Sequence, residues 1–187
     1  RLWICPSWIE PPDANGINLS LDPGLAFGTG SHPTTHLCLR WLDKQDLAGQ
    51  TVIDYGCGSG ILGIAALLLG AEKVIAVDND PQALLATRDN AERNNIAAER
   101  ISTYLPEELP ADTVGQTMLA NILAAPLIEL APKLTALTAS NGLICLSGLL
   151  EHQITAVSQP YLGNFAFDDP AIETEWAQLA ARKTALS

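Results

Sequence analysis

Positive charge is scarce in this sequence. Ten lysines and arginines stand against 21 aspartates and glutamates, which leaves a formal net charge of −11 and an isoelectric point of about 4.5. Surfaces that hold nucleic acid need clustered basic side chains to neutralise phosphates, so direct binding of DNA or RNA is not expected. An acidic chain suits a basic protein partner, although ordinary solubility explains the same balance equally well.

Long apolar runs are also missing. The longest, residues 61–69, contains a glycine and is far shorter than the roughly 20 residues that cross a bilayer. The start of the chain has no signal-peptide pattern. The cysteines form no C-x-x-C pair, which is typical of reduced thiols in a cytosolic protein; they are Cys5, Cys38, Cys57 and Cys145. We therefore expect a cytoplasmic protein that is not attached to a membrane.

The apolar content is nevertheless high enough for a sizeable core. A chain of 187 residues that is 48% hydrophobic suits one domain, and it shows no internal repeat. The first residue is Arg1 and the single methionine is Met118, which indicates a chain that begins inside a longer protein. We expect it to be a monomer.

The most informative stretch covers residues 51–80. Residues 51–53 are apolar and β-branched, which predicts a strand buried on both faces. Asp54 and a glycine-rich turn follow, then an apolar helix over 61–69 and a second apolar strand over 73–77. This order predicts the first βαβ unit of a nucleotide-binding sheet, with its two strands as parallel neighbours.

The glycine turn has the properties of a ligand site. Glycine lets a ligand lie against bare backbone, and free N–H groups at a helix start hold a polar ligand end. Asp78 lies 22 residues after Gly56, close to the spacing of about 20 expected for an acid that binds a ribose diol. A dinucleotide-dependent oxidoreductase would favour G-x-G-x-x-G, whereas the third glycine, Gly60, comes one residue early. The remaining alternative is a glycine turn in an ordinary α/β protein.

A second unusual stretch, residues 22–36, precedes this unit. It contains a glycine-rich loop, and then Ser31, which we expect to cap a helix that begins near Pro33 and ends near residue 44. Thr34 and Thr35 fall in the first turn of that helix, where hydroxyls and free backbone donors are placed to meet a ligand carboxylate.

No metal site is predicted. His32 and His36 are four residues apart and share a helix face, but no third ligand is evident nearby. A surface position, or a position in a lid over the site, is the expected place of both histidines.

The pattern Asp54-x-Gly56-x-Gly58-x-Gly60 resembles the first motif of S-adenosylmethionine-dependent methyltransferases. Over nearly the whole chain, the sequence resembles the ribosomal protein L-eleven methyltransferases, which methylate amines of a large-subunit ribosomal protein. The loop before residue 31 is the most selective part of this resemblance. Its segments are residues 21–30, His32, 34–35, 54–60, 77–81, 90–94, 120–123 and 147–149.

The resemblance implies a fold and a cofactor. The fold would be a Rossmann-like class I methyltransferase of the α/β class: a mostly parallel seven-stranded sheet with helices on both faces and a C-terminal antiparallel strand. The cofactor would be S-adenosylmethionine. Gly58 and Gly60 would shape the turn, and the loop with Phe27 and Gly28 would cover the methionine end. The cofactor contacts implied by the family are Thr35, Gly56, Asp78 and Asn121.

Asn121 is the one residue to which the resemblance gives a catalytic role. It follows a predicted strand over 117–120, so it should face the same crevice as Gly56 and Asp78. Its amide oxygen would accept a hydrogen bond from the target amine and aim it at the methyl group. Many related amino-methyltransferases have Pro-Pro-aromatic next, where this chain has Ile122-Leu123, as the ribosomal-protein family itself does. The alternative is an asparagine that caps the following helix.

The other elements complete the expected sheet. Helices are predicted over 81–95, 123–137 with a break at Pro132, and 151–161. Strands are predicted over 17–21, 101–105, 143–146 after an Asn141-Gly142 turn, 164–167 and 175–181, the last two as a closing antiparallel hairpin. Residues 1–12 look extended.

These features predict one methyltransferase domain. Residues 1–48 would form an N-terminal extension with a loop and helix over the cofactor, and 51–187 the Rossmann-like core. The family implies a preceding domain that recognises the ribosomal protein, and nothing in this sequence corresponds to it. The predicted function is transfer of methyl groups to lysine and N-terminal amines of that ribosomal protein. The alternatives are methylation of another protein or of RNA, and a cofactor-binding fragment without activity.

Overall fold

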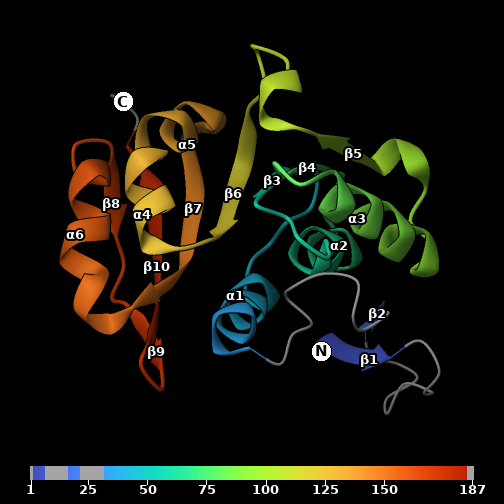
Figure 1. Ribbon diagram of the computed structural model, residues 1–187, viewed down its shortest axis with the longest axis horizontal. Coiled ribbons are helices and arrows are strands. Elements are labelled where there is room, and N and C mark those ends of the chain that lie inside the picture. The colour runs from blue at the N-terminus through green and yellow to red at the C-terminus, as the bar shows by residue number, and fades with distance from the viewer. Residues whose placement is uncertain (1, 7–16, 22–31, 185–187) are drawn as a thin grey trace.

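The sheet is built outward from β3 (Thr51–Tyr55), which pairs in parallel with β4 (Lys73–Val77) on one side and β6 (Gly115–Asn121) on the other. Figure 1 shows this arrangement in a computed structural model, which describes residues 2–6, 17–21 and 32–184. The glycine turn and α2 (Ile61–Leu68) connect β3 to β4, so the predicted βαβ unit is confirmed.

Five parallel strands run from the edge strand β5 (Ile101–Tyr104) through β4, β3 and β6 to β7 (Thr138–Leu150). The C-terminal strand β10 (Trp176–Lys183) lies antiparallel to β7, and β8 (Phe165–Phe167) pairs with its far side. The seven strands on this path and the antiparallel ending confirm the predicted class. An eighth strand, β9 (Ala171–Glu173), also pairs with β10 and was not predicted, because three residues are too short to show an alternating pattern.

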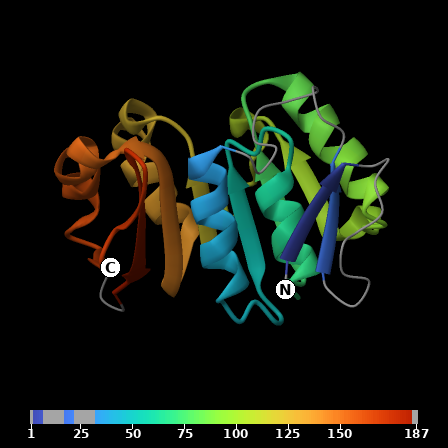
Figure 2. The ribbon, with the colours of Figure 1, turned by 90° about the horizontal axis from the view of Figure 1, so that it is seen from below.

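Helices cover both faces of the sheet, as Figures 1 and 2 show. The two-residue repeat of the strands divides the core accordingly. Val52 packs with the helices α1 (Pro33–Asp43), α2 and α3 (Pro81–Arg93), whereas Ile53 packs with α4 (Ala124–Glu129), α5 (Ala131–Leu137) and α6 (Ile154–Ser158). Along β3, β6 and β7, every second side chain therefore faces the side of the sheet that α1 and α2 cover.

The smaller elements fill the connections. The parallel pair β1 (Leu2–Pro6) and β2 (Ile17–Leu21) confirms the predicted strand over 17–21 and adds one in the extended N-terminal segment. Leu19 of β2 is buried in the core cluster of α2 and α3. Short 3-10 turns are η1 (Ala98–Arg100), η2 (Pro106–Glu108), η3 (Glu151–Gln153) and η4 (Gln159–Tyr161). Among the described residues, no helix is long and apolar enough to cross a membrane.

The structure confirms a break in the helix predicted over 123–137 and corrects two other local predictions. Two helices meet there at Leu130, because Pro132 cannot continue the first one. The region 151–161 is η3, α6 and η4 rather than one helix. Asn141-Gly142 is not a turn before the strand but an interior part of β7, where Asn141 has a positive φ of 63° and the pairing with β6 shifts between Gly115 and Thr117. An irregularity of this kind accommodates the positive φ inside a strand.

The start of α1 differs in its cap. His32, not Ser31, is the N-cap residue, and its Nδ1 accepts a hydrogen bond from the backbone N–H of Thr34 at 3.2 Å. Pro33 occupies the first helical position as predicted, because proline has no N–H that the helix start would leave unpaired. Ser31 lies outside the described residues. The helix nevertheless begins where the sequence indicated, with Thr34 and Thr35 in its first turn.

Asp54 ties β3 to α2 from inside the core. Its side chain is only 1% exposed, and its Oδ2 accepts a hydrogen bond from the backbone N–H of Gly63 at 3.0 Å. Burial raises the pKa of Asp54 to about 7; the Gly63 hydrogen bond opposes this shift and the charge of Asp78 adds to it. The folded chain therefore holds the Asp54 proton more tightly than the unfolded chain does.

We predict a pH-dependent loss of stability from this carboxyl. Its contribution is fully present below pH 4, is lost as the pH rises, and is gone above about 7, because the raised pKa favours the protonated native state. Asp54→Asn keeps the shape and removes the titration. The difference in free energy of unfolding between Asp54→Asn and wild type, measured in urea, should grow by about 2 kcal/mol from pH 5 to 8. A difference that stays constant across this range would contradict the raised pKa.

Candidate functional site

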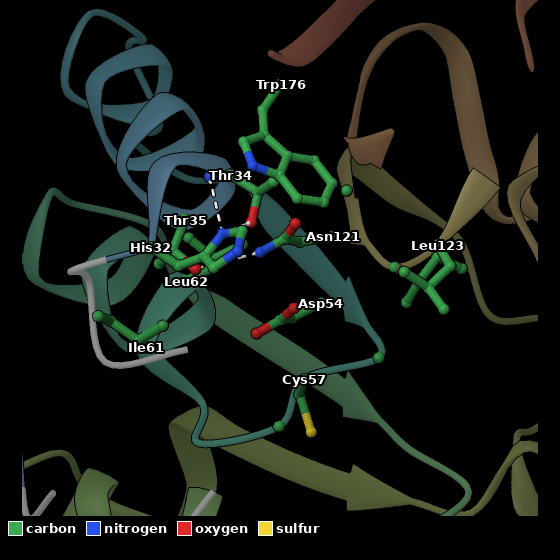
Figure 3. A pocket seen from close by; sticks show the side chains of 14 residues that line it. His32, Thr34, Thr35, Asp54, Cys57, Ile61, Leu62, Asn121, Leu123 and Trp176 are labelled. Atoms are coloured by element: carbon green, nitrogen blue, oxygen red, sulfur yellow. Dashed lines mark hydrogen bonds between the residues drawn. The ribbon is translucent and has the colours of Figure 1, made fainter. Parts of the chain in front are cut away.

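A cavity of about 470 Å³ opens at the edge of the sheet where β3, β6 and β7 end and the antiparallel β10 begins (Figure 3). Ligands of open parallel sheets bind at this edge. The lining residues come from the start of α1, the glycine turn, the first turn of α2 and the ends of these strands. They are His32, Thr34, Thr35, Asp54, Gly56, Cys57, Gly58, Ile61, Leu62, Asn121, Ile122, Leu123, Gly148 and Trp176.

Strand register brings three predicted residues to one level. Tyr55 of β3 pairs with Val77 of β4 and with Ala120 of β6. The residues that directly follow these three positions are Gly56, Asp78 and Asn121. They therefore lie next to one another at the same edge of the sheet. The structure thus brings together the residues that the sequence placed on one crevice.

The glycine turn is held against the end of β4. The backbone N–H groups of Gly56 and Cys57 both donate to the carbonyl of Val77, at 2.7 and 3.0 Å. Gly56 and Gly58 line the cavity with bare backbone, as predicted for a ligand turn. Gly60 does not line it: its φ is +84°, and a Cβ there would lie 2.9 Å from Cγ2 of Thr87 on α3. Gly60 therefore allows α2 and α3 to pack closely beside the turn.

Asp78 lies beside the turn rather than in the cavity wall. Its Oδ2 accepts a hydrogen bond from the N–H of Gly58, and its Oδ1 accepts one from the N–H of Asp80, both at 3.0 Å. These bonds fix the carboxylate at the end of β4 while each oxygen keeps further acceptor capacity. Asp78 is half-buried, so a ligand that lies along Gly56 and Gly58 can reach it.

Asn121 and Thr35 meet across the cavity. The amide Nδ2 of Asn121 donates to Oγ1 of Thr35 at 3.3 Å, which links the end of β6 to the first turn of α1 (Figure 3). With Nδ2 used in this way, the acceptor Oδ1 of Asn121 is left for a ligand. The capping alternative for Asn121 is wrong, because the N-cap of α4 is Leu123 and Asn121 is the last residue of β6.

Ser147 and Gly148 of β7 hold this corner together, and no role was predicted for them from the sequence. The Ser147 hydroxyl donates to the carbonyl of Thr34 at 3.2 Å, and the Ser147 carbonyl accepts from the N–H of Ile122 at 3.0 Å. Gly148 has a φ of +95°, and a Cβ there would lie 1.8 Å from the carbonyl oxygen of Ile122. Only glycine fits a position with this backbone and this neighbour. The signal in the sequence was the Ser147-Gly148 pair itself, but its positive φ is not visible there.

Trp176 is another residue of the cavity whose role was not predicted from the sequence. It enters the cavity from the start of β10, and its ring meets the His32 ring edge-on, with centroids 5.1 Å apart and an interplanar angle of 65°. Figure 3 shows both rings together with Asn121 among the side chains that line the cavity. An aromatic wall is thus present, and it is supplied by a strand far along the chain from Asn121.

The histidines do not form a metal site. His36 Nδ1 pairs with Oε1 of Glu173 at 2.7 Å, and His32 Nδ1 contacts the Thr34 hydroxyl at 2.9 Å. Within the ranges that the structure describes, no group of three or more His, Cys, Asp or Glu could hold a metal ion. Phe27 and Gly28, the predicted cover of the cofactor, lie outside the described residues.

Among the described residues that line the cavity, no thiol is an activated nucleophile. Cys57 lines the cavity, but burial raises the pKa of its thiol well above the usual range, so it stays protonated. Cys38 and Cys145 are buried free thiols whose sulfur atoms are 3.9 Å apart, and burial raises the pKa of Cys145 as well. The arrangement is suited to holding and orienting ligands through backbone, hydroxyl, amide and carboxylate groups.

The sequence comparisons point to one protein family. The sequence model of the ribosomal protein L11 methyltransferase (PrmA) family matches residues 1–184. The chain is 60% identical over 183 residues to the ribosomal protein L11 methyltransferase of Cellvibrio japonicus and 56% identical to that of Escherichia coli. In both cases the match covers 98% of this chain and 62% of the relative, so the chain spans less than two thirds of their length.

The structural comparisons agree. The crystal structure of a ribosomal protein L11 methylase from Lactobacillus delbrueckii subsp. bulgaricus superposes with a TM-score of 0.88 at 33% identity, covering 98% of this chain and 95% of that one. SMU.776, provisionally assigned as a methyltransferase and solved in complex with SAH, gives 0.67 at 12% identity, over 82% of this chain and 50% of that one; it shows the shared fold alone. The chain therefore belongs to the ribosomal protein L11 methyltransferase (PrmA) family.

Proposed function

We propose that this chain is the catalytic part of an S-adenosylmethionine-dependent protein methyltransferase, and that its substrates are lysine and N-terminal amines of ribosomal protein L11. The names of its relatives support the substrate. The observation that carries the proposal is the strand register, which places Gly56, Asp78 and Asn121 next to one another at one edge of the sheet. Such an enzyme would act as a monomer in the cytoplasm, where ribosomal proteins are made.

The residues of the cavity fit S-adenosylmethionine. A volume of about 470 Å³ falls within the range of about 300–1,000 Å³ for small-ligand sites. Gly56 and Gly58 give a bare surface for the ligand, and Asp78 has acceptor capacity for the ribose hydroxyls. Thr35 lies at a helix start, where a hydroxyl can donate to the methionine carboxylate. The buried carboxyl of Asp54 also lines the cavity and would be stabilised as an anion by a cationic ligand.

S-adenosylmethionine, when bound, supplies a methyl group already activated by a sulfonium. The chain is then left with a positioning task, in which an amine lone pair is held in line with that methyl. This agrees with a site that lacks an activated thiol and has a fixed amide. The Thr35 contact sets the orientation of the Asn121 side chain, so its Oδ1 can accept a hydrogen bond from the amine without adding charge.

The amine must also arrive neutral. At pH 7 a lysine with a pKa near 10.4 costs about 4–5 kcal/mol to deprotonate, whereas an α-amine near 7.7–8.0 costs about 1 kcal/mol. Ile122 and Trp176 make the amine end of the cavity largely apolar. Desolvation there would lower the lysine pKa and reduce the cost.

The decisive test is methyl transfer itself. The chain should transfer label from S-adenosylmethionine to purified ribosomal protein L11, and mass analysis should place the methyl groups on lysine side chains and the N-terminal amine. A ribosomal protein of similar charge is the control and should stay unlabelled. Cofactor binding without transfer to L11 at any protein concentration would reduce the chain to a binding fragment and reject the proposed activity.

Asp78→Ala should weaken the binding of S-adenosylmethionine at least tenfold, because the ribose loses its carboxylate partner and the turn loses the bond to the Gly58 N–H. Isothermal calorimetry measures the dissociation constant directly. Asp89→Ala, an exposed acid on α3, is the matched control for the change in charge. Equal affinity in Asp78→Ala and wild type would remove Asp78 from the ribose site.

Asn121→Ala should lower kcat about 10- to 100-fold at saturating cofactor, because the amine loses the oxygen that aims it. Single-turnover measurements with both substrates saturating separate this effect from cofactor binding. Gln159→Ala, which removes an exposed amide in η4, is the control. Full turnover by Asn121→Ala with cofactor bound would show that Asn121 does not orient the amine.

A further inference from the structure

Leu123 is an apolar side chain in a position that the fold does not explain. It is 68% exposed, the highest value among the large apolar side chains that are exposed in the described part of the chain. It is also the N-cap residue of α4, where no side chain caps the first turn. Serine, threonine, aspartate and asparagine stabilise such a position, and leucine does not. Leu123 therefore violates two local preferences, because a large apolar side chain is exposed and the N-cap position has no capping side chain.

The position of Leu123 supplies a reason. It lines the same cavity as Asn121, two residues further along the chain. Leu123 violates these local preferences at the edge of a site, and no contact within the described part of the fold compensates for it. Such a residue is expected to have a role in that site. One exposed leucine alone would need no explanation, but an exposed leucine at a helix cap in a cavity wall does.

Sheet order shows which part of a ligand Leu123 faces. The glycine turn and Asp78 follow β3 and β4, whereas Leu123 follows β6, and Gly148 and Trp176 belong to β7 and β10 beyond it. A nucleoside held by the glycine turn and Asp78 would therefore lie on the opposite side of Asn121 from Leu123. Figure 3 shows Leu123 on the side of Asn121 away from Ile61. An amine that reaches Asn121 from the β6–β10 side has to pass Leu123.

We propose that Leu123 packs against the methylene stem of a lysine substrate and makes the site favour lysine side chains over α-amines without such a stem. This inference rests on the proposed function. A lysine carries four apolar methylenes between its backbone and its amine, and an exposed leucine at the mouth removes part of that stem from water. An α-amine is attached directly to the backbone and brings no stem to this contact. The apolar contact thus offsets part of the higher cost of presenting lysine as a neutral amine.

The test uses two peptides with the full chain. One carries a single lysine and an acetylated N-terminus; the other has a free N-terminal glycine and no lysine. Burial of two methylenes corresponds to roughly tenfold in affinity, so Leu123→Ser should raise KM for the lysine peptide about tenfold and leave kcat within about threefold. KM for the glycine peptide should change less than twofold. The midpoint of thermal unfolding should stay equal or rise, because serine is the better cap.

Two further variants control the measurement. Leu123→Met keeps an apolar side chain and should keep the wild-type KM for the lysine peptide. Leu162→Ser removes another exposed leucine, 54% exposed and outside the cavity lining, and should change neither peptide. An equal loss for both peptides in Leu123→Ser, or no loss for the lysine peptide, would overturn the proposal.

A binding measurement tests the contact between Leu123 and the lysine stem without turnover. Nα-acetyl-Nε-trimethyl-lysine methylamide is titrated by NMR into the chain saturated with S-adenosylhomocysteine. Binding about tenfold weaker in Leu123→Ser than in wild type and Leu162→Ser supports the stem contact. Equal binding in all three, or no binding to wild type, overturns it. Failure of the proposed function gives a different result, which is a wild-type chain that methylates neither peptide nor L11.

Discussion

The register of β3 against its two neighbours is the constraint on which the rest of this molecule depends. Tyr55 is level with Val77 and Ala120, so the chain leaves three adjacent strands at the same height. A slip of one residue would exchange the two faces of a strand and remove Asn121 from the cavity. The buried alternation of these strands prevents that slip, because Val52 and Ile53 pack into different clusters on opposite faces. The site is thus fixed by the same packing that fixes the core.

The two-residue repeat also explains why α1 takes part in the site. Leu119 of β6 and Cys145 of β7 belong to the core cluster beneath α1 and α2. Asn121 and Ser147 lie two residues further along these strands and therefore face the same side. There they meet Thr35 and Thr34, in the first turn of α1, through the two hydrogen bonds that close this corner. The helix before β3 is thereby part of the cavity wall.

The sequence predicted those parts of the structure that local chemistry determines. Apolar runs with glycine and acid at their ends identified the βαβ unit, and the ends of strands identified Gly56, Asp78 and Asn121. Trp176, Ser147 and Gly148 were not identified, because their place depends on how β7 and β10 pair, over a distance of many residues. The irregularity at Asn141 and the three-residue β9 also depend on pairing rather than on local pattern. Gly60 shows the reverse case, since a glycine in the predicted motif contacts Thr87 of the fold and not the cavity.

Asp54 connects the stability of this chain to its ligand. The carboxyl is buried at the cavity wall, close enough to Asp78 for the two charges to disfavour each other, and its pKa of about 7 reflects that environment. A fold selected for stability alone would place an apolar side chain or an amide there. A cationic ligand beside Asp54 would favour the ionised carboxylate, so binding and ionisation would support each other. The unfavourable burial of Asp54 in the free chain would then be a source of ligand affinity at neutral pH, and the same residue that weakens the empty fold would strengthen the occupied one.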